Sequence, residues 1–209
     1  MSLIFCAFCF FVYFLFSSAD LPASAAARTC PESITTPAAL TLATYDNNLF
    51  EVNCLFALEA AGQDLDVDYI DGTSNSALII SAWQGFPDIA YVLLAHGANT
   101  NIRGYKGKTA LQQAAKYGHT SIVNAILLNG TDVDLKSEVG WTALMQSCYE
   151  DEREDVFDLL MQKELNLDIQ NNEGWTALMI AAGRHCLRIN PMHLTTHPCL
   201  LQKKDVCTK

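Results

Sequence analysis

The sequence predicts an all-α solenoid of stacked helix-turn-helix units with short β-hairpin loops, with about four full repeats and a truncated fifth. Three observations predict it. A short motif recurs with successive offsets of 33, 33 and 34 residues, at Ser76-Ala77-Leu78, Thr109-Ala110-Leu111, Thr142-Ala143-Leu144 and Thr176-Ala177-Leu178. A fixed period of this length is typical of repeat proteins. Apolar residues within a unit follow helical spacing, and half of the chain is apolar, so stacked units can share one interior.

The second copy of the motif, which opens the third unit, shows how one unit is built. Its apolar residues follow the i, i+3, i+4 spacing of a helix; they are Leu111, Ala114, Ala115, Ile122, Val123, Ile126 and Leu127. The pattern predicts two short amphipathic helices, about Ala110–Tyr117 and Thr120–Asn129, separated by Gly118. The Thr109 hydroxyl can cap the first helix, and Gly130 can supply the left-handed residue that ends the second.

Each helix pair is followed by a second shared stretch, Gly97-Ala98-Asn99-Thr100-Asn101-Ile102 in one unit and Gly130-Thr131-Asp132-Val133-Asp134-Leu135 in the next. Together with Gly107-Lys108-Thr109-Ala110-Leu111, Ala114-Ala115 and Gly118-His119, it resembles the ankyrin repeat. The resemblance covers about Thr36 to Gly183 and implies a structural role for His119. Gln, Met or Ile replaces the family's His after the Leu, so we expect weaker Thr–His hydrogen bonds.

We expect the chain to divide into four parts. The resemblance covers residues 36–183, the ankyrin-repeat domain; we expect residues 1–27 to be a signal peptide or N-terminal anchor, 28–35 a linker, and 184–209 an irregular C-terminal tail. The first unit, about Thr36 to Val67, is expected to act as a cap. We expect its second helix to be about two residues longer than its counterparts, and two further residues in the hairpin near Asp71-Gly72.

The fourth and fifth units depart from the pattern. The turn Glu150 to Asp155 replaces the Gly-His turn and is either a solvated acidic loop or a patch for a basic partner. Glu164 stands where other units have a helix-ending Gly, and left-handed geometry there would cost on the order of 1 kcal/mol. The fifth unit loses the pattern after Gly183, which leaves half a repeat.

The N-terminus predicts export. Leu3 to Phe16 is an uncharged apolar run whose helix would span roughly 21 Å, too short for the ~30 Å hydrocarbon core of a membrane. The Ala-x-Ala patterns at 23–25 and 25–27 are typical of signal-peptide cleavage sites, and Ser17-Ser18-Ala19 is an alternative site. We therefore expect a secreted, endomembrane or periplasmic protein. An uncleaved anchor at a membrane, or a non-functional start on a cytoplasmic protein, remains an alternative.

The eight cysteines do not define a disulfide framework, because their spacing is irregular. Cys148 occupies the small buried slot of Ala82 and Ala115, which indicates a core thiol, and we expect Cys54 to pack as well. The tail collects His185, Cys186, His193, His197, Cys199 and Cys207. It lacks the paired cysteines of a zinc finger, so we expect no metal and no cofactor. A tail disulfide remains open.

No motif in the chain indicates an enzyme. The stretch from Gly104 to Thr109 ends in Gly-Lys-Thr like a phosphate-binding loop, but its spacing is too short. The formal net charge of −10 disfavours nucleic acid, whose binding depends on clustered lysine and arginine, and permits a basic protein partner. A membrane contact is expected only if the N-terminal segment is an uncleaved anchor.

The resemblance implies that a protein partner binds the concave face formed by the hairpin tips and first helices. Aromatic residues dominate interface hot spots, and our candidate contacts are Tyr105, Lys108, Glu138, Trp141, Glu173 and Trp175. The alternative for the two tryptophans is packing on a neighbouring hairpin. We expect a monomeric interaction scaffold. Two other functions stay open: a regulatory or inhibitory subunit of a secreted or membrane enzyme, and a metal- or redox-responsive tail on a scaffold.

Overall fold

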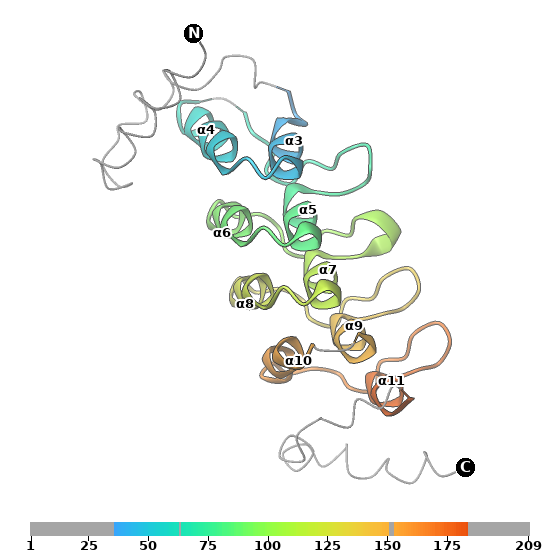
Figure 1. The fold of residues 1–209 in the computed structure, drawn as a ribbon. Coiled ribbons are helices and arrows are strands. Elements are labelled where there is room, and N and C mark those ends of the chain that lie inside the picture. Colours follow the sequence, from blue (N-terminus) through green and yellow to red (C-terminus); the bar gives the residue numbers. More distant parts are fainter. Residues whose placement is uncertain (1–35, 63, 151–152, 184–209) are drawn as a thin grey trace.

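In the computed structural model, residues 36–62, 64–150 and 153–183 are described. They form two adjacent columns of helices (Figure 1). The first helices of the units are α3 (Ala39–Tyr45), α5 (Ala77–Gln84), α7 (Ala110–Tyr117), α9 (Ala143–Tyr149) and α11 (Ala177–Gly183). The second helices are α4 (Leu49–Ala60), α6 (Pro87–Ala95), α8 (Thr120–Leu128) and α10 (Glu154–Met161). The predicted helical solenoid is confirmed, and each repeated motif starts a helix at its alanine.

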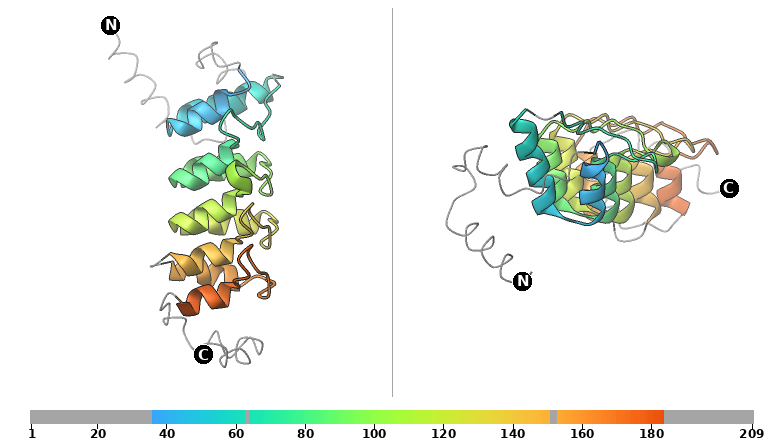
Figure 2. Two further views of the ribbon diagram at one scale, coloured as in Figure 1. Left: turned by 90° about the vertical axis from the view of Figure 1, so that its right-hand side faces the viewer. Right: turned by 90° about the horizontal axis from the view of Figure 1, so that it is seen from above.

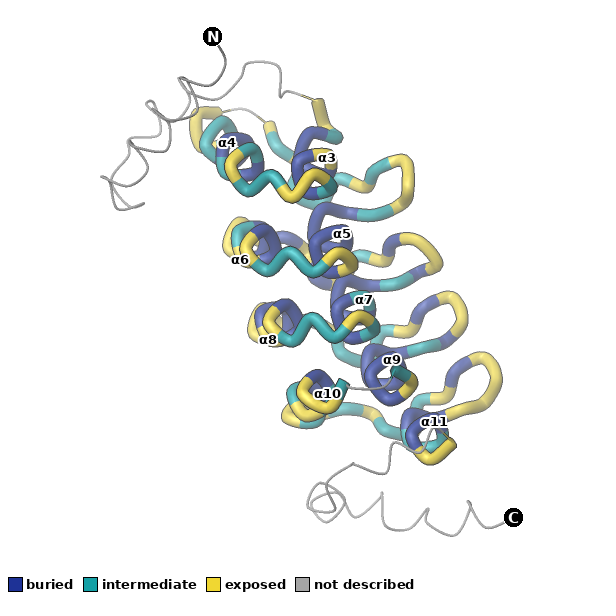
Figure 3. The backbone as a smooth tube through the Cα atoms, viewed as in Figure 1, coloured by how far each residue is buried: buried dark blue, intermediate teal, exposed yellow. Residues whose placement is uncertain are grey.

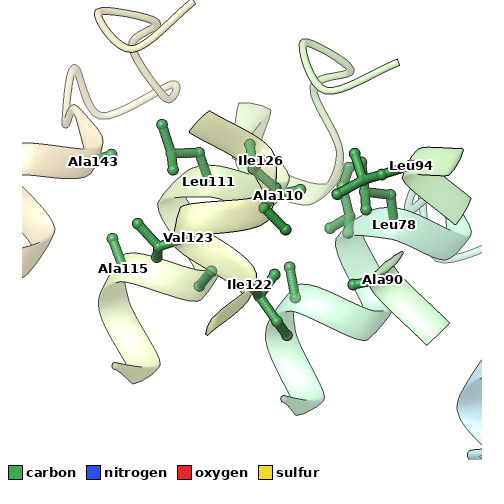
Figure 4. Packing of buried hydrophobic residues seen from close by; sticks show 14 of the residues in the cluster. Leu78, Ala90, Leu94, Ala110, Leu111, Ala115, Ile122, Val123, Ile126 and Ala143 are labelled. Atoms are coloured by element: carbon green, nitrogen blue, oxygen red, sulfur yellow. The ribbon is translucent and has the colours of Figure 1, made fainter. Parts of the chain in front are cut away.

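The interior runs without a break through the stack (Figures 3 and 4). Leu78, Leu111 and Leu144, the leucines of the repeated motif, are all buried. Ile122, Val123 and Ile126 of α8 fill the space between the columns. Because each unit buries its apolar side chains against its neighbours, the units stabilise one another rather than folding alone.

The loops that join successive units project to one side of the first helices, away from the second helices (Figure 1). We call their tips fingers: Asp71–Asn75, Gly104–Lys108, Ser137–Trp141 and Asn171–Trp175. In each finger the first residue's N–H donates to the fifth residue's carbonyl, at 2.8 to 3.0 Å. The second finger contains a single 3-10 turn, Tyr105–Gly107. None of the described fingers has a regular strand.

Neighbouring fingers are hydrogen-bonded to one another. The backbone N–H of Tyr105 donates to Asn75 Oδ1 at 3.2 Å, and that of Glu138 donates to the Lys106 carbonyl at 3.1 Å. The N–H of Asn172 donates to the Val139 carbonyl at 3.2 Å. The four fingers therefore form one connected row, which the side view in Figure 2 follows along the stack.

Three threonines cap first helices, as expected for Thr109. Thr109, Thr142 and Thr176 each accept a hydrogen bond from a backbone N–H three residues on, at 3.3 Å. We expected weaker hydrogen bonds where the family's histidine after the Leu is replaced. This expectation is wrong for the third unit, because Gln112 makes hydrogen bonds in place of the histidine. Its Oε1 accepts from Thr109 N, and its Nε2 donates to the carbonyls of Leu135 and Trp141 at 2.6 and 3.0 Å.

The second helix of the first unit is longer than its counterparts, as expected: α4 has 12 residues, and α6, α8 and α10 have 9, 9 and 8. The two further residues expected in the hairpin lie elsewhere. The side chains of Asp66, Asn99, Asp132 and Asn166 each accept from the N–H two residues on. Because Asp66 and Asn99 accept the same hydrogen bond, they occupy equivalent positions in their units. Gly62 then lies two residues further from Asp66 than Gly97 lies from Asn99. The two residues are therefore inserted just after α4, and the finger at Asp71-Gly72 has the ordinary length.

Glu164 carries no left-handed strain. Among the described residues, the non-glycine positions with positive φ are Asn47, Ser74 and Lys106. α10 ends at Met161, and Gln162 follows with a right-handed backbone. Gly97 and Gly130 do have the expected positive φ.

The expectations for residues 1–35 and for the tail 184–209 lie outside the described residues. No helix in the described part of the chain is both long and apolar enough to cross a membrane.

Candidate functional site: the concave face

We call the surface formed by the fingers and the exposed side of the first helices the concave face. Its finger tips are exposed, whereas the limbs that return to the helices are buried (Figure 3). Tyr105 is 57% exposed and Trp175 is 48% exposed. Glu138 and Glu173 are also exposed at finger tips. Four of the six candidate residues are therefore available to a partner.

Trp141 differs from Trp175. Its side chain is half-buried, and its ring makes an edge-on contact with Tyr149 of the same unit, with ring centroids 5.2 Å apart. The packing alternative therefore applies to Trp141, although its neighbour is a first helix and not the next finger. Tyr149 remains exposed, so the pair still presents an aromatic edge on the concave face.

Lys108 is half-buried at the base of the second finger. Its pKa is lowered by burial, and further by repulsion from the ammonium groups of Lys116 and Lys106. Lys108 is therefore near enough to each of the other two lysines for their charges to affect its own. Lys106 and Lys116 were not among the sequence candidates. The signal that could have found them is local: no Asp or Glu occurs from Ile89 to Thr131.

Two cysteines and the acidic turn were also singled out in the sequence. Cys148 is buried as expected, and Cys54 is both buried on α4 and disulfide-bonded. In the acidic turn, Glu154 and Asp155 form the exposed first turn of α10, where negative charge favours the helix dipole. The described residues contain no group of three or more His, Cys, Asp or Glu side chains placed to hold a metal ion.

Paired helices in two columns with a row of bonded fingers define a helical-repeat solenoid, the class of proteins in which each unit contacts only its neighbours. The chain belongs to the ankyrin-repeat family: a family model described as ankyrin repeats in three copies matches residues 40–137 and 111–189. Domains of this family are typically non-catalytic.

Plant ubiquitin ligases are among the similar proteins. "Probable E3 ubiquitin-protein ligase XBOS32" of Oryza sativa subsp. japonica is 46% identical over 52 residues, which are 25% of this chain and 10% of that protein. "E3 ubiquitin-protein ligase XBAT33" of Arabidopsis thaliana is also 46% identical over 52 residues, with the same coverage. The match to each thus spans a tenth of the relative's length and concerns the ankyrin region.

Proposed function

We propose that this protein is an interaction scaffold that binds a protein partner on its concave face, as a monomer. The observation that carries the proposal is the row of hydrogen-bonded fingers with exposed Tyr105 and Trp175 at its edge. A surface that is ordered before binding loses little conformational entropy when a partner docks. Large aromatic side chains on such a surface supply contact area with few rotatable bonds.

The distribution of exposed aromatic residues allows a matched test. Trp175 is exposed on a finger, whereas Tyr91 is 47% exposed on α6 in the other column. Affinity capture from the cells that make the protein would compare the unaltered chain with Trp175→Ala, Tyr105→Ala and Tyr91→Ala. We expect the two finger variants to lose the captured partner and Tyr91→Ala to retain it. Retention by all three variants, or loss only with Tyr91→Ala, would refute the proposal.

We also propose export of the protein through its N-terminal segment. The apolar run followed by Ala-x-Ala sites supports it, and the disulfide at Cys54 fits an oxidising compartment. Sequencing the N-terminus of the mature protein tests the proposal. A start between Asp20 and Arg28 is the expected result, and a start at Met1 would contradict cleavage and export by this route.

A further inference from the structure

The third unit carries concentrated positive charge in a chain that is acidic overall. The 43 residues from Ile89 to Thr131 include Arg103, Lys106, Lys108 and Lys116 but no acidic residue, while the whole chain has a formal net charge of −10. The second helices carry acidic side chains, among them Glu51, Glu59, Asp88, Glu154 and Asp155. A local patch of opposite sign to the whole molecule attracts ligands that the rest of the surface repels.

Three lysines of this stretch come from one unit, Lys106 and Lys108 from the finger Gly104–Lys108 and Lys116 from the last turn of the α7 helix that follows it. Lys106 Nζ lies 5.2 Å from the ring centroid of Tyr105, and Lys116 Nζ lies 5.2 Å from that of Tyr117. Lys108 stands at the base of the same finger and interacts with both of the other lysines. Within the described ranges, none of the three forms an ion pair. The cluster therefore presents uncompensated charge flanked by two exposed aromatic rings.

The next unit places aromatic residues where the third unit has lysines. Trp141 and Tyr149 follow Lys108 and Lys116 by 33 residues each, and their rings are in contact. Packed helices lie about 8–10 Å apart, and an extended chain advances about 3.3 Å per residue. A peptide along the stack would thus pass from the lysines to the aromatic pair in about three residues.

We infer that the concave face recognises an extended acidic protein segment, with carboxylates at Lys106, Lys108 and Lys116 and an apolar side chain, about three residues away, at Trp141 and Tyr149. The inference rests on the proposed function and specifies its partner. The inferred ligand is acidic, although the net negative charge of the whole chain also permits a basic partner. A protein segment fits better than nucleic acid, because a peptide can carry its carboxylates at the lysines alone and uncharged residues beside Asp71, Glu138 and Glu173. A nucleic acid has a phosphate at every nucleotide, and these three acidic side chains would repel it.

Selection from a random 12-residue peptide library displayed on phage tests this inference. The full chain would be the bait, alongside a variant with Lys108→Glu and Lys116→Glu. A third bait, Lys163→Glu, carries a reversed charge at an exposed site just after α10 and serves as the control. Circular dichroism would establish that all three baits are folded.

The expected selection by the unaltered chain is peptides with Asp or Glu about three residues from an apolar residue. The double variant should bind these peptides at least tenfold more weakly, and Lys163→Glu should bind them normally. Two results would overturn the inference. Selected peptides without acidic residues, lost on Trp175→Ala but not on the lysine changes, would leave concave-face binding intact and remove its charge preference. Displacement of the peptides by a single-stranded oligonucleotide at equal concentration would point to nucleic acid instead.

Discussion

The imidazole ring of His119 lies against Gly85 of the preceding unit. A Cβ atom at Gly85 would fall 2.4 Å from His119 Cε1, and Gly85 has a φ of 81°, so only glycine fits beneath the ring. One unit along, Arg153 lies against Gly118 in the same way, with Nη1 2.6 Å from where a Cβ would be. Both side chains bond to the preceding unit, His119 to the Trp83 carbonyl and Arg153 Nε to that of Lys116.

The stability of the stack should fall below neutral pH because of His119. Burial lowers the pKa of His119 from 6.5, the Arg153 charge lowers it further, and the bond to the Trp83 carbonyl raises it in part. Since the folded-state pKa lies below that of the unfolded chain, the unfolded state binds the proton more tightly. The contribution of neutral His119 to the free energy of unfolding is therefore complete above about pH 6.5, and it is lost as the pH falls below that value.

Urea unfolding between pH 7 and pH 5 checks this expectation. His119→Gln removes the titrating group and keeps a donor for the carbonyl, so its free energy of unfolding should fall less than that of the unaltered chain. Equal pH dependence in the two proteins would show that His119 is not responsible.

Arg153→Ala should destabilise the protein by about 1 kcal/mol, the net value of one hydrogen bond. The reason is that the Lys116 carbonyl loses its donor and Gly118 loses its covering side chain. Lys163→Ala removes an exposed positive charge and should stay within about 0.5 kcal/mol. Thermal unfolding of both variants measures the difference, and similar melting temperatures would argue against a role for Arg153 in the stack.

Gln112→Met should cost about 2 kcal/mol, because it leaves two carbonyls and one N–H without their partner. Methionine occupies the same position in the next unit at Met145, so the side chain fits the site. Gln113→Met is the matched control, since Gln113 Oε1 lies buried and makes no hydrogen bond within the described part of the chain. Urea unfolding that ranks Gln113→Met as the more damaging change would contradict this account of the network.

Ser74→Gly should stabilise the protein by about 0.5–1 kcal/mol. Ser74 has a φ of 64°, and its counterparts in the other fingers are Gly107, Gly140 and Gly174, all with positive φ. The reverse change, Gly174→Ser, should destabilise by a similar amount, because open space surrounds that position and only the backbone resists. Calorimetric melting temperatures that move the other way would exclude backbone strain at Ser74.

The repeated motif predicts the fold well because its residues act locally. The alanines at 77, 110, 143 and 177 each begin a helix, since a capping position precedes each one and an apolar face follows it. The register of the first unit could not be predicted the same way. In the sequence, Gly62 followed by Asp64 resembles Gly97 followed by Asn99. Only the hydrogen bond that the Asp66 side chain accepts shows that Asp66, and not Asp64, is equivalent to Asn99.

The finer features of the site depend on contacts between units. One inserted residue hides the equivalence of Arg153 and His119, because a change of residue type and a shift in spacing occur together. The clustering of Lys106, Lys108 and Lys116 is masked by a net charge averaged over the whole chain. Trp141 and Trp175 share a sequence position, but within residues 36–183 as described only Trp141 has an aromatic partner, because Gly183 stands where the previous unit has Tyr149.

Site-specific photo-crosslinking tests the claim of concave-face binding most directly. A benzoylphenylalanine would replace Tyr105 on the second finger or Tyr91 on α6, two tyrosines of comparable exposure in different columns. Irradiation in the cells that make the protein should yield a discrete protein adduct from position 105 and none from position 91. An adduct from position 91 alone, or the same adduct from both positions, would contradict binding on the concave face.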